Sequence, residues 1–361
     1  MLIPVASATL RAHNSPITSV AFHADNTRLV SGDEEGWVIQ WSIITRRPMS
    51  IFRPHRGVIL ALHWLKDDLL LTHARDNKIY VFRIENQNLD TRLPTANDSG
   101  ESHQKPWMVL SMDVNALNFC GAAVVETNRI AVPGTLDSDT IDVYDLFPDF
   151  SRPYKAIKHN NLKTGIVMTL QFASRTKLLS GYESGHVIIF ELLNNAVTAI
   201  CYANKCHTQP LLSLSINYID NTFLSSSADS KLVKHLLSPT SAESESLSTN
   251  DIHHSGISSV DVRDDNKIIT VACWDGRVRV FLYKSCNVLA SFKGGRQDGV
   301  TVARFGKTVW EDEAYTTDLE SKDSRVVQKS NILLRHENKI KKKHWIAVGG
   351  KDGRIGLWEI Y

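Results

Sequence analysis

Histidine, hydroxyl and carboxylate residues recur along this chain at spacings that could support either nucleophilic catalysis or buried hydrogen-bond networks. In each of four places, a histidine precedes an acidic turn residue by 21 or 22 positions. In three of them a serine or threonine stands four positions before that turn residue. The three fuller sets are His13, Ser31 and Glu35; His55, Thr72 and Asp76; and His207, Ser225 and Asp229. The fourth is the pair His253 and Asp275.

The repetition of these sets argues for a structural role. A serine hydrolase needs one exposed nucleophile beside an oxyanion hole, whereas here the same grouping returns at regular intervals. The G-x-S-x-G, P-loop and H-E-x-x-H motifs are absent from the sequence. The sequence therefore predicts no catalytic centre.

One cluster, Cys201, Cys206 and His207, has a loose metal-like spacing. A structural zinc site needs four ligands, and no second Cys or His pair with matching spacing is present. The five cysteines are odd in number and irregularly spaced, which indicates free thiols in a reducing compartment. We expect neither a metal nor a cofactor.

The elements that would position the polar sets are short strands ending in an aromatic anchor. The anchors are mostly about 41–46 residues apart, the period of a propeller blade, and two longer intervals mark insertions. The anchoring segments are SGDEEGWVIQW to Trp41, THARDNKIYVF to Phe82, VPGTLDSDTIDVY to Tyr144, SGYESGHVIIF to Phe190, SSSADSKLVKH to His235, VACWDGRVRVF to Phe281 and VGGKDGRIGLW to Trp358. The pattern predicts an all-β, seven-bladed β-propeller formed by residues 1–361 as a single domain.

An alternating apolar run precedes each of these segments and predicts the innermost strand of each blade. The seven runs are Ile17–Phe22, Val58–Trp64, Met108–Val114, Ile166–Phe172, Leu211–Asn217, Ile257–Arg263 and Val300–Phe305. The run Ile3–Leu10 has no partner in its own blade, so we expect it to be the outer strand of the last blade and to close the ring.

The recurring sets resemble the buried tetrad of the WD-repeat family, in which the turn carboxylate accepts a hydrogen bond from a histidine that also meets a hydroxyl. The resemblance implies structural tetrads at the sets above, completed by Trp41 in copy one and represented by Asp352 and Trp358 in copy seven. Copy one comes closest to the full set, with Glu35 as its carboxylate. Copy five ends in His235, so its polar network should differ.

Two insertions interrupt the pattern. Residues 85–105 are polar and rich in Asn, Ser and Pro, so we expect them to be flexible. Residues 306–343, between the first two strands of copy seven, are acidic in front and basic behind. They are either a solvated loop or a partner-binding arm. Candidate partner-binding residues are Trp310, Tyr315, Leu333, Leu334, Lys341, Lys342 and Lys343.

Composition narrows the function. The net charge is +2, which is too close to neutral for a direct nucleic-acid binder, and no run of about 18 apolar residues is present to cross a membrane. The start of the chain does not read as a secretory signal. These features favour a non-enzymatic protein-interaction scaffold of the cytosol or nucleus, with a monomeric propeller inside a larger assembly.

The divergent propeller, with SGDEEGWVIQW in copy one and GGKDGRIGLWEIY at the end, resembles the fungal family of ASTRA-associated WD-repeat proteins and its animal G-protein-β-like relatives. The resemblance implies a nuclear subunit acting in chromatin regulation and in maturation of PI3-kinase-related kinases. The implied partners are a Tel/Tti co-chaperone module, RuvB-like ATPases and PI3-kinase-related proteins. The alternative is a substrate receptor of a cullin-type ubiquitin ligase. Those propellers usually carry Asp and Arg just after the anchor aromatic, and the anchors here have no matching Arg.

Overall fold

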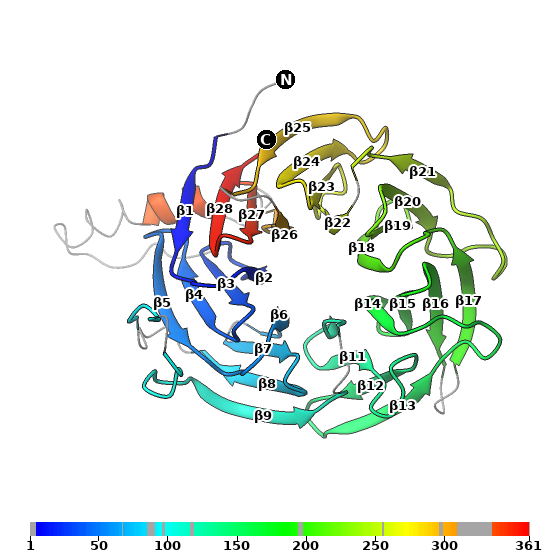
Figure 1. Cartoon of the computed structure of the whole chain (residues 1–361), viewed down its shortest axis with the longest axis horizontal. Helices are drawn as coiled ribbons and strands as arrows, with labels where there is room; N and C mark the ends of the chain where they lie inside the picture. The colour runs from blue at the N-terminus through cyan, green and yellow to red at the C-terminus, as the bar shows by residue number, and fades with distance from the viewer. Residues whose placement is uncertain are drawn as a thin grey trace, which may run out of the picture.

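The computed structural model describes residues 5–66, 68–84, 91–95, 98–115, 119–193, 198–254, 256–295, 299–308 and 334–360. Its strands form seven four-stranded antiparallel sheets arranged in a ring, which is a seven-bladed β-propeller, as the repeat predicts (Figure 1). Each blade runs outward from the centre in chain order, except the last, whose outer strand comes from the beginning of the chain.

The first four blades contain these strands. Blade one has β2 (Ile17–Phe22), β3 (Arg28–Asp33), β4 (Val38–Ser42) and β5 (Arg47–Phe52). Blade two has β6 (Ile59–Trp64), β7 (Leu69–Ala74), β8 (Lys78–Arg83) and β9 (Trp107–Asp113). Blade three has β10 (Ala123–Val125), β11 (Arg129–Pro133), β12 (Ile141–Asp145) and β13 (Ser151–Ile157). Blade four has β14 (Val167–Ser174), β15 (Lys177–Tyr182), β16 (His186–Leu192) and β17 (Thr198–Lys205).

The last three blades complete the ring. Blade five has β18 (Leu211–Asn217), β19 (Thr222–Ser227), β20 (Lys231–Leu236) and β21 (Ser248–Asp251). Blade six has β22 (Ile257–Val262), β23 (Ile268–Cys273), β24 (Arg277–Leu282) and β25 (Val288–Lys293). Blade seven has β26 (Val300–Phe305), β27 (Trp345–Gly350), β28 (Arg354–Glu359) and β1 (Ala8–Arg11).

Burial along the strands follows their position in the blade. The first strands mix buried with partly exposed residues, because they also border the central cavity. The second strands, such as β7, are buried throughout, because neighbouring blades cover both faces. Apolar residues of adjacent blades therefore form shared clusters, such as the one that joins Val30 of β3 to Ile59 of β6.

The N-terminal strand closes the ring. Strand β1 pairs antiparallel with β28, with Ala8 opposite Leu357 and Arg11 opposite Arg354. Leu10 is 1% exposed and belongs to the same cluster as Leu357 and Ile17. The predicted pairing with the last blade is confirmed, but the strand covers Ala8–Arg11 rather than Ile3–Leu10, of which Ile3 and Pro4 lie outside the described residues.

The predicted inner strand of blade three is wrong. Residues Trp107–Asp113 form β9, the outer strand of blade two, which pairs with β8. The true inner strand, β10, has only three residues and pairs with β11. A run of that length gives no alternating pattern, and β9 is long and apolar enough to be mistaken for an inner strand.

The insertion of blade two lies between its third and fourth strands, and part of it is held against blade one. Arg53 donates from Nε to the Glu35 carbonyl at 2.9 Å and from Nη1 to the Asp98 carbonyl at 3.1 Å. His103 is buried, lies 2.9 Å from the Asp98 carboxylate and 3.2 Å from the Ile51 carbonyl, and its ring meets Trp37 edge-on. These contacts contradict the expectation of a flexible loop for Asp98 and His103.

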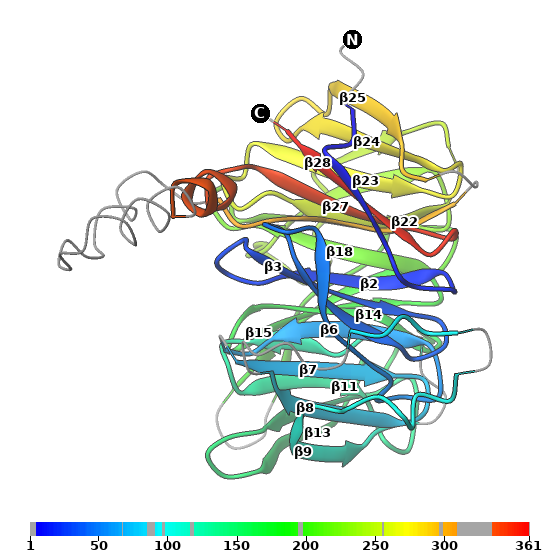
Figure 2. The ribbon, with the colours of Figure 1, turned by 90° about the vertical axis from the view of Figure 1, so that its left-hand side faces the viewer.

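The insertion of blade seven lies between β26 and β27, as predicted, and its described part ends in a helix over residues 334–341. With the disc seen edge-on, this helix lies beyond one face of the propeller (Figure 2). Sequence reasoning missed it because, among the described residues 334–341, only the Ile340 side chain is buried. One apolar contact leaves no helical period to detect.

Candidate functional site

Blade one contains a complete four-residue polar network. His13 Nδ1 lies 2.7 Å from Asp33 Oδ2, and His13 Nε2 lies 2.7 Å from Ser31 Oγ. Trp41 Nε1 donates to the same hydroxyl at 2.8 Å. Because the carboxylate only accepts, His13 donates to Asp33, Ser31 donates to His13, and Trp41 donates to Ser31.

The carboxylate of this network is Asp33, so the assignment to Glu35 is wrong. Glu35 is exposed and its Oε1 accepts a hydrogen bond from Ser15 Oγ at 2.6 Å. Asp33, the last residue of β3, also accepts from the backbone amides of Glu35 and Trp37, each at 3.0 Å. In the longer turn of blade one the acid therefore stands at the end of the strand, two positions earlier than in blades two and five.

Blade two has the same arrangement without an aromatic donor. His55 Nδ1 lies 2.9 Å from Asp76 Oδ1, and His55 Nε2 lies 2.8 Å from Thr72 Oγ1. Burial pushes the pKa of Asp76 upward, but His55 and the backbone amides of Arg56 and Lys78 together outweigh it, so the pKa lies below the ordinary value. Asp76 is therefore an acceptor at neutral pH, and it holds the loop of His55 against the β7–β8 turn.

Blade five extends the network to five side chains. His207 Nδ1 lies 3.0 Å from Asp229 Oδ2, and His207 Nε2 lies 2.8 Å from Ser225 Oγ. His235 Nε2 lies 2.8 Å from the same hydroxyl, and its Nδ1 lies 2.8 Å from the Tyr202 hydroxyl. Burial, together with the charge of His207, lowers the pKa of His235 to about 3, so it is neutral.

The acidic end of this hydrogen-bond network fixes which group donates at each step. Since Asp229 accepts from His207, Ser225 must donate to His207, His235 to Ser225, and Tyr202 to His235. His235, at the anchor position of blade five, therefore has the same role as Trp41 in blade one, because each donates a hydrogen bond to the serine hydroxyl. Cys206 borders this network, with Sγ 3.8 Å from His235 Nε2.

Blade six departs from the prediction. The side chain of His253 is 86% exposed and its Nδ1 lies 3.6 Å from Asp251 Oδ1, so it does not join a buried network. Asp275 binds Arg279 instead, at 2.6 Å. The neighbouring His254 lies 3.7 Å from Asp275. A backbone φ of 58° at His253 turns its side chain away from the blade, and spacing alone gives no sign of that turn.

Blade seven keeps only parts of the motif. Asp352 lies in the β27–β28 turn and accepts from the backbone amide of Arg354 at 3.2 Å. Trp358 is 4% exposed and packs on Phe292, with ring centroids 4.7 Å apart. The aromatic anchor of this blade therefore fills space between blades six and seven.

Blade three contains a buried acid that the sequence analysis missed. Asp142, fully buried in β12, accepts from the amides of Thr135 and Ala156, each at 2.8 Å, and pairs with Arg152. Burial opposes its ionisation, but these bonds lower its pKa. The signal was the single acid of the apolar run Ile-Asp-Val-Tyr, since a lone charge in a buried strand needs partners.

The side chains of these polar sets are placed relative to one another as in a catalytic triad. Whether a substrate can reach the hydroxyl groups therefore decides their role. The hydroxyl groups of Ser31, Thr72 and Ser225 belong to residues with 0% exposure. A nucleophile must reach a substrate, and none of these hydroxyls borders solvent. Their geometry serves to satisfy buried polar groups that link the loops of each blade.

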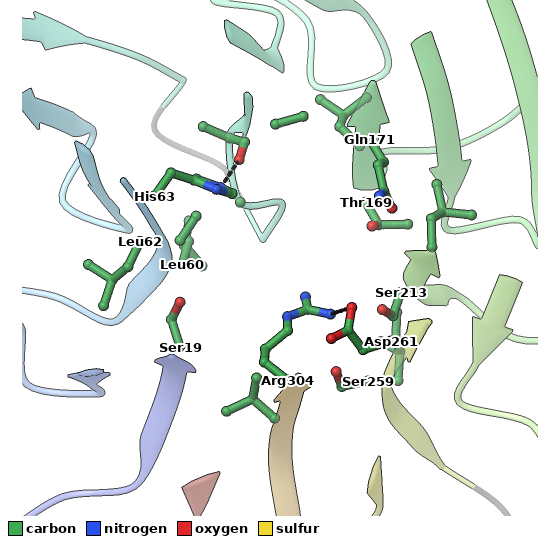
Figure 3. A pocket seen from close by; sticks show the side chains of 18 of the residues that line it. Ser19, Leu60, Leu62, His63, Thr169, Gln171, Ser213, Ser259, Asp261 and Arg304 are labelled. Atoms are coloured by element: carbon green, nitrogen blue, oxygen red, sulfur yellow. Dashed lines mark hydrogen bonds and ion pairs between the residues drawn. The ribbon is translucent and has the colours of Figure 1, made fainter. Parts of the chain in front are cut away.

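The central channel is the second place where chemistry-bearing residues meet (Figure 3). Its cavity of about 460 Å³ is bordered by the first strands of the blades. Arg304 lies 3.5 Å from Asp261 and 3.2 Å from the Val260 carbonyl. His63 donates to the Ala122 carbonyl at 2.8 Å, and burial lowers its pKa to about 4. Arg304 and Asp261 lie within ion-pair distance of each other, but burial outweighs the arginine and raises the pKa of Asp261 above its usual value.

The candidate partner-binding residues are only partly described. Trp310, Tyr315 and Leu333 lie outside the described residues. Leu334 is the first described residue of the helix and is 52% exposed. Lys341 pairs with Glu337 at 2.8 Å, Lys343 pairs with Glu359, and Lys342 is exposed.

The described residues also bear on membrane and metal binding. Among the described residues, no helix is both long and apolar enough to cross a membrane. In the described ranges, His, Cys, Asp and Glu side chains form no group of three that could hold a metal ion.

The fold defines a β-propeller, and in blades one, two and five its recurrent histidine, hydroxyl and acidic residues form hydrogen-bonded networks with buried hydroxyls. A family model described as ASTRA-associated protein 1 matches residues 6–358, and the chain belongs to this family. It is 32% identical over 381 residues to ASTRA-associated protein 1 of Verticillium alfalfae, covering 99% of this chain and 93% of the relative. It is 30% identical over 406 residues to that of Schizosaccharomyces pombe, covering 100% of both.

Proposed function

We propose that this protein is a non-enzymatic scaffold subunit of an ASTRA assembly. The observation that carries the proposal is the burial of every hydroxyl in the triad-like sets, at Ser31, Thr72 and Ser225. In these blades the buried polar residues stabilise the loops, so partners would be bound by residues on the surface. The chain is similar over nearly its full length to relatives named ASTRA-associated protein 1, and that name supports association with this assembly.

The finer proposal concerns partners and place. The protein acts in the nucleus, in chromatin regulation and in the maturation of PI3-kinase-related kinases, alongside a Tel/Tti co-chaperone module and RuvB-like ATPases. A rigid disc with a long insertion beyond one face suits this role, because rigid scaffolds commonly present binding residues on loops.

Affinity purification of the tagged full-length chain tests the assembly. We expect the co-chaperone module and the RuvB-like ATPases to co-purify, and depletion of the protein to lower the level of PI3-kinase-related kinases. Recovery of a cullin adaptor in their place would replace the proposal with the ubiquitin-ligase alternative. A fluorescent fusion of the same chain tests the nuclear location.

A second variant tests the insertion. Replacing residues 308–342 with a Gly/Ser linker leaves all strands of blade seven in place. We expect an unchanged melting temperature, or a small decrease from the loss of Ile340, together with weaker recovery of the co-chaperone module. Full recovery from the shortened protein would move the binding surface to the blades.

A further inference from the structure

A pocket of about 230 Å³ lies between the helix of residues 334–341 and blades seven and one. Figure 1 shows this helix at the rim of the ring, beside β1. We call it the helix pocket. Its apolar lining includes Ile44 from the β4–β5 turn, Ile340 from the helix, and Trp345 and Leu357 from blade seven. Ile340, Trp345 and Leu357 are buried, whereas Ile44 is partly accessible.

The wall formed by the helix is fixed to the propeller. Trp345 donates from Nε1 to the Ile340 carbonyl at 3.0 Å. Asn26, in the β2–β3 loop, donates to the Lys341 carbonyl at 3.2 Å. The end of the helix is therefore tied to both blades that border the pocket, and the helix pocket is preformed.

The rim of the helix pocket is basic. Arg46 from blade one and His336, Lys339 and Lys343 from the insertion line it. Lys343 is paired with Glu359, but no ion pair joins Arg46 or Lys339 to an acid within the described parts of the chain. Both of these side chains belong to exposed residues, so the rim carries uncompensated positive charge around an apolar floor.

Size and chemistry indicate the occupant. Small-molecule sites usually measure about 300–1,000 Å³, so this volume suits one side chain better than a cofactor. A nucleic acid would need an open aromatic platform, and Trp345 is only 4% exposed. An apolar floor inside a basic rim complements a chain segment with one apolar side chain between carboxylates.

We propose that the helix pocket binds an acidic segment of a partner protein, with one aliphatic or aromatic side chain of that segment on its floor. Arg46 and Lys339 attract the flanking carboxylates, and Ile44 contacts the apolar side chain. The inference deepens the proposed scaffold function by giving a place and a chemistry to one of its partner contacts.

The test is a fluorescence-anisotropy titration of the purified full-length chain. The probe is a short fluorescein-labelled peptide with one leucine flanked on both sides by glutamates. We expect saturable binding, weakened roughly ten-fold by Lys339→Glu, Arg46→Glu or Ile44→Ser, and weakened to a similar extent when serine replaces the leucine of the probe. Arg335→Glu is the matched control, because Arg335 is exposed on the same helix and does not line the pocket.

Four results would overturn the inference: no binding of the probe, equal loss with Arg335→Glu, equal affinity for the leucine and serine probes, or tighter binding of a single-stranded DNA of the same charge. Thermal melts of each variant show whether the fold is intact. The scaffold proposal is judged separately. If the wild-type chain recovers its assembly from cells but does not bind the probe, only the helix pocket fails, whereas loss of the assembly removes the scaffold proposal.

Discussion

His235 and Trp41 deliver the same hydrogen bond in two different blades. Trp41 Nε1 lies 2.8 Å from Ser31 Oγ, and His235 Nε2 lies 2.8 Å from Ser225 Oγ. An imidazole can replace an indole here because both present a ring N–H, but His235 has a second nitrogen that needs a donor, which Tyr202 supplies. A histidine in place of the tryptophan therefore also requires a hydroxyl donor, here Tyr202, from β17, the outer strand of the neighbouring blade.

Replacing His235 with phenylalanine should destabilise the protein by about 1–3 kcal/mol, because Ser225 loses a donor and the Tyr202 hydroxyl loses its acceptor. The new ring would keep the stacking on Phe223, whose centroid lies 4.6 Å from that of His235. Urea unfolding measures the loss. Tyr202→Phe, which removes only the terminal hydrogen bond, should cost less, and an equal or greater cost would contradict the order of donors.

Stability should fall when the pH is lowered below about 6.5, well before the carboxylates titrate. Burial lowers the pKa of both His235 and His73 to about 3, and His73 Nδ1 accepts from the Ala122 amide at 3.0 Å. Both must be neutral when folded, whereas in the unfolded chain they bind protons near pH 6.5. The unfolded state therefore holds more protons between these values, and stability present above pH 6.5 is lost toward pH 3.

Unfolding free energies at pH 7 and pH 5 check this. The wild type should lose up to about 1.4 kcal/mol per pH unit for each such histidine. In His235→Phe the loss between the two pH values should be smaller, because one of these groups is gone. An identical loss in both proteins would show that His235 is not a buried neutral group.

Asp33 and Glu35 should respond differently to mutation. Asp33→Ala removes the acceptor of His13 and of two backbone amides and should cost about 1–3 kcal/mol. Glu35→Ala removes one exposed contact to Ser15 and should change stability by less than about 0.5 kcal/mol. Thermal melts of the two variants side by side decide which acid belongs to the network, and a larger effect at Glu35 would reverse the assignment.

The fold was predictable because the same spacing recurs in seven copies, so a deviation in one copy does not hide the repeat. The details of each blade depend on single residues. Fixed spacing located the networks of His55 and His207 but placed the acid of blade one at Glu35, since a sequence does not show how many residues a turn contains. Strand β10 has too few residues to give a pattern. The helix of residues 334–341 has one buried side chain, Ile340. Its position depends in part on a hydrogen bond from Asn26, which lies far away in the sequence.

Removing residues 1–11 should destabilise the propeller by at least about 3 kcal/mol, because β28 loses its partner and Leu10 leaves the core. The exposed edge should also promote aggregation. Light scattering and thermal melts measure both effects. Removing residues 1–5 keeps β1 and is the matched control, and two deletions of equal stability would show that β1 does not close the ring.

The pairing of β1 with β28 also sets an order in time. A ribosome makes β1 before the first six blades and its partner β28 after them, since Ala8 lies opposite Leu357. Until β28 is made, Leu10 can pack only on the blade-one residues of its cluster, such as Ile17. Each newly completed blade presents an apolar face to solvent until the next one covers it. The ring can close as a single cooperative unit only after β28 has been made. The growing chain must therefore avoid aggregation while all seven blades are being synthesised.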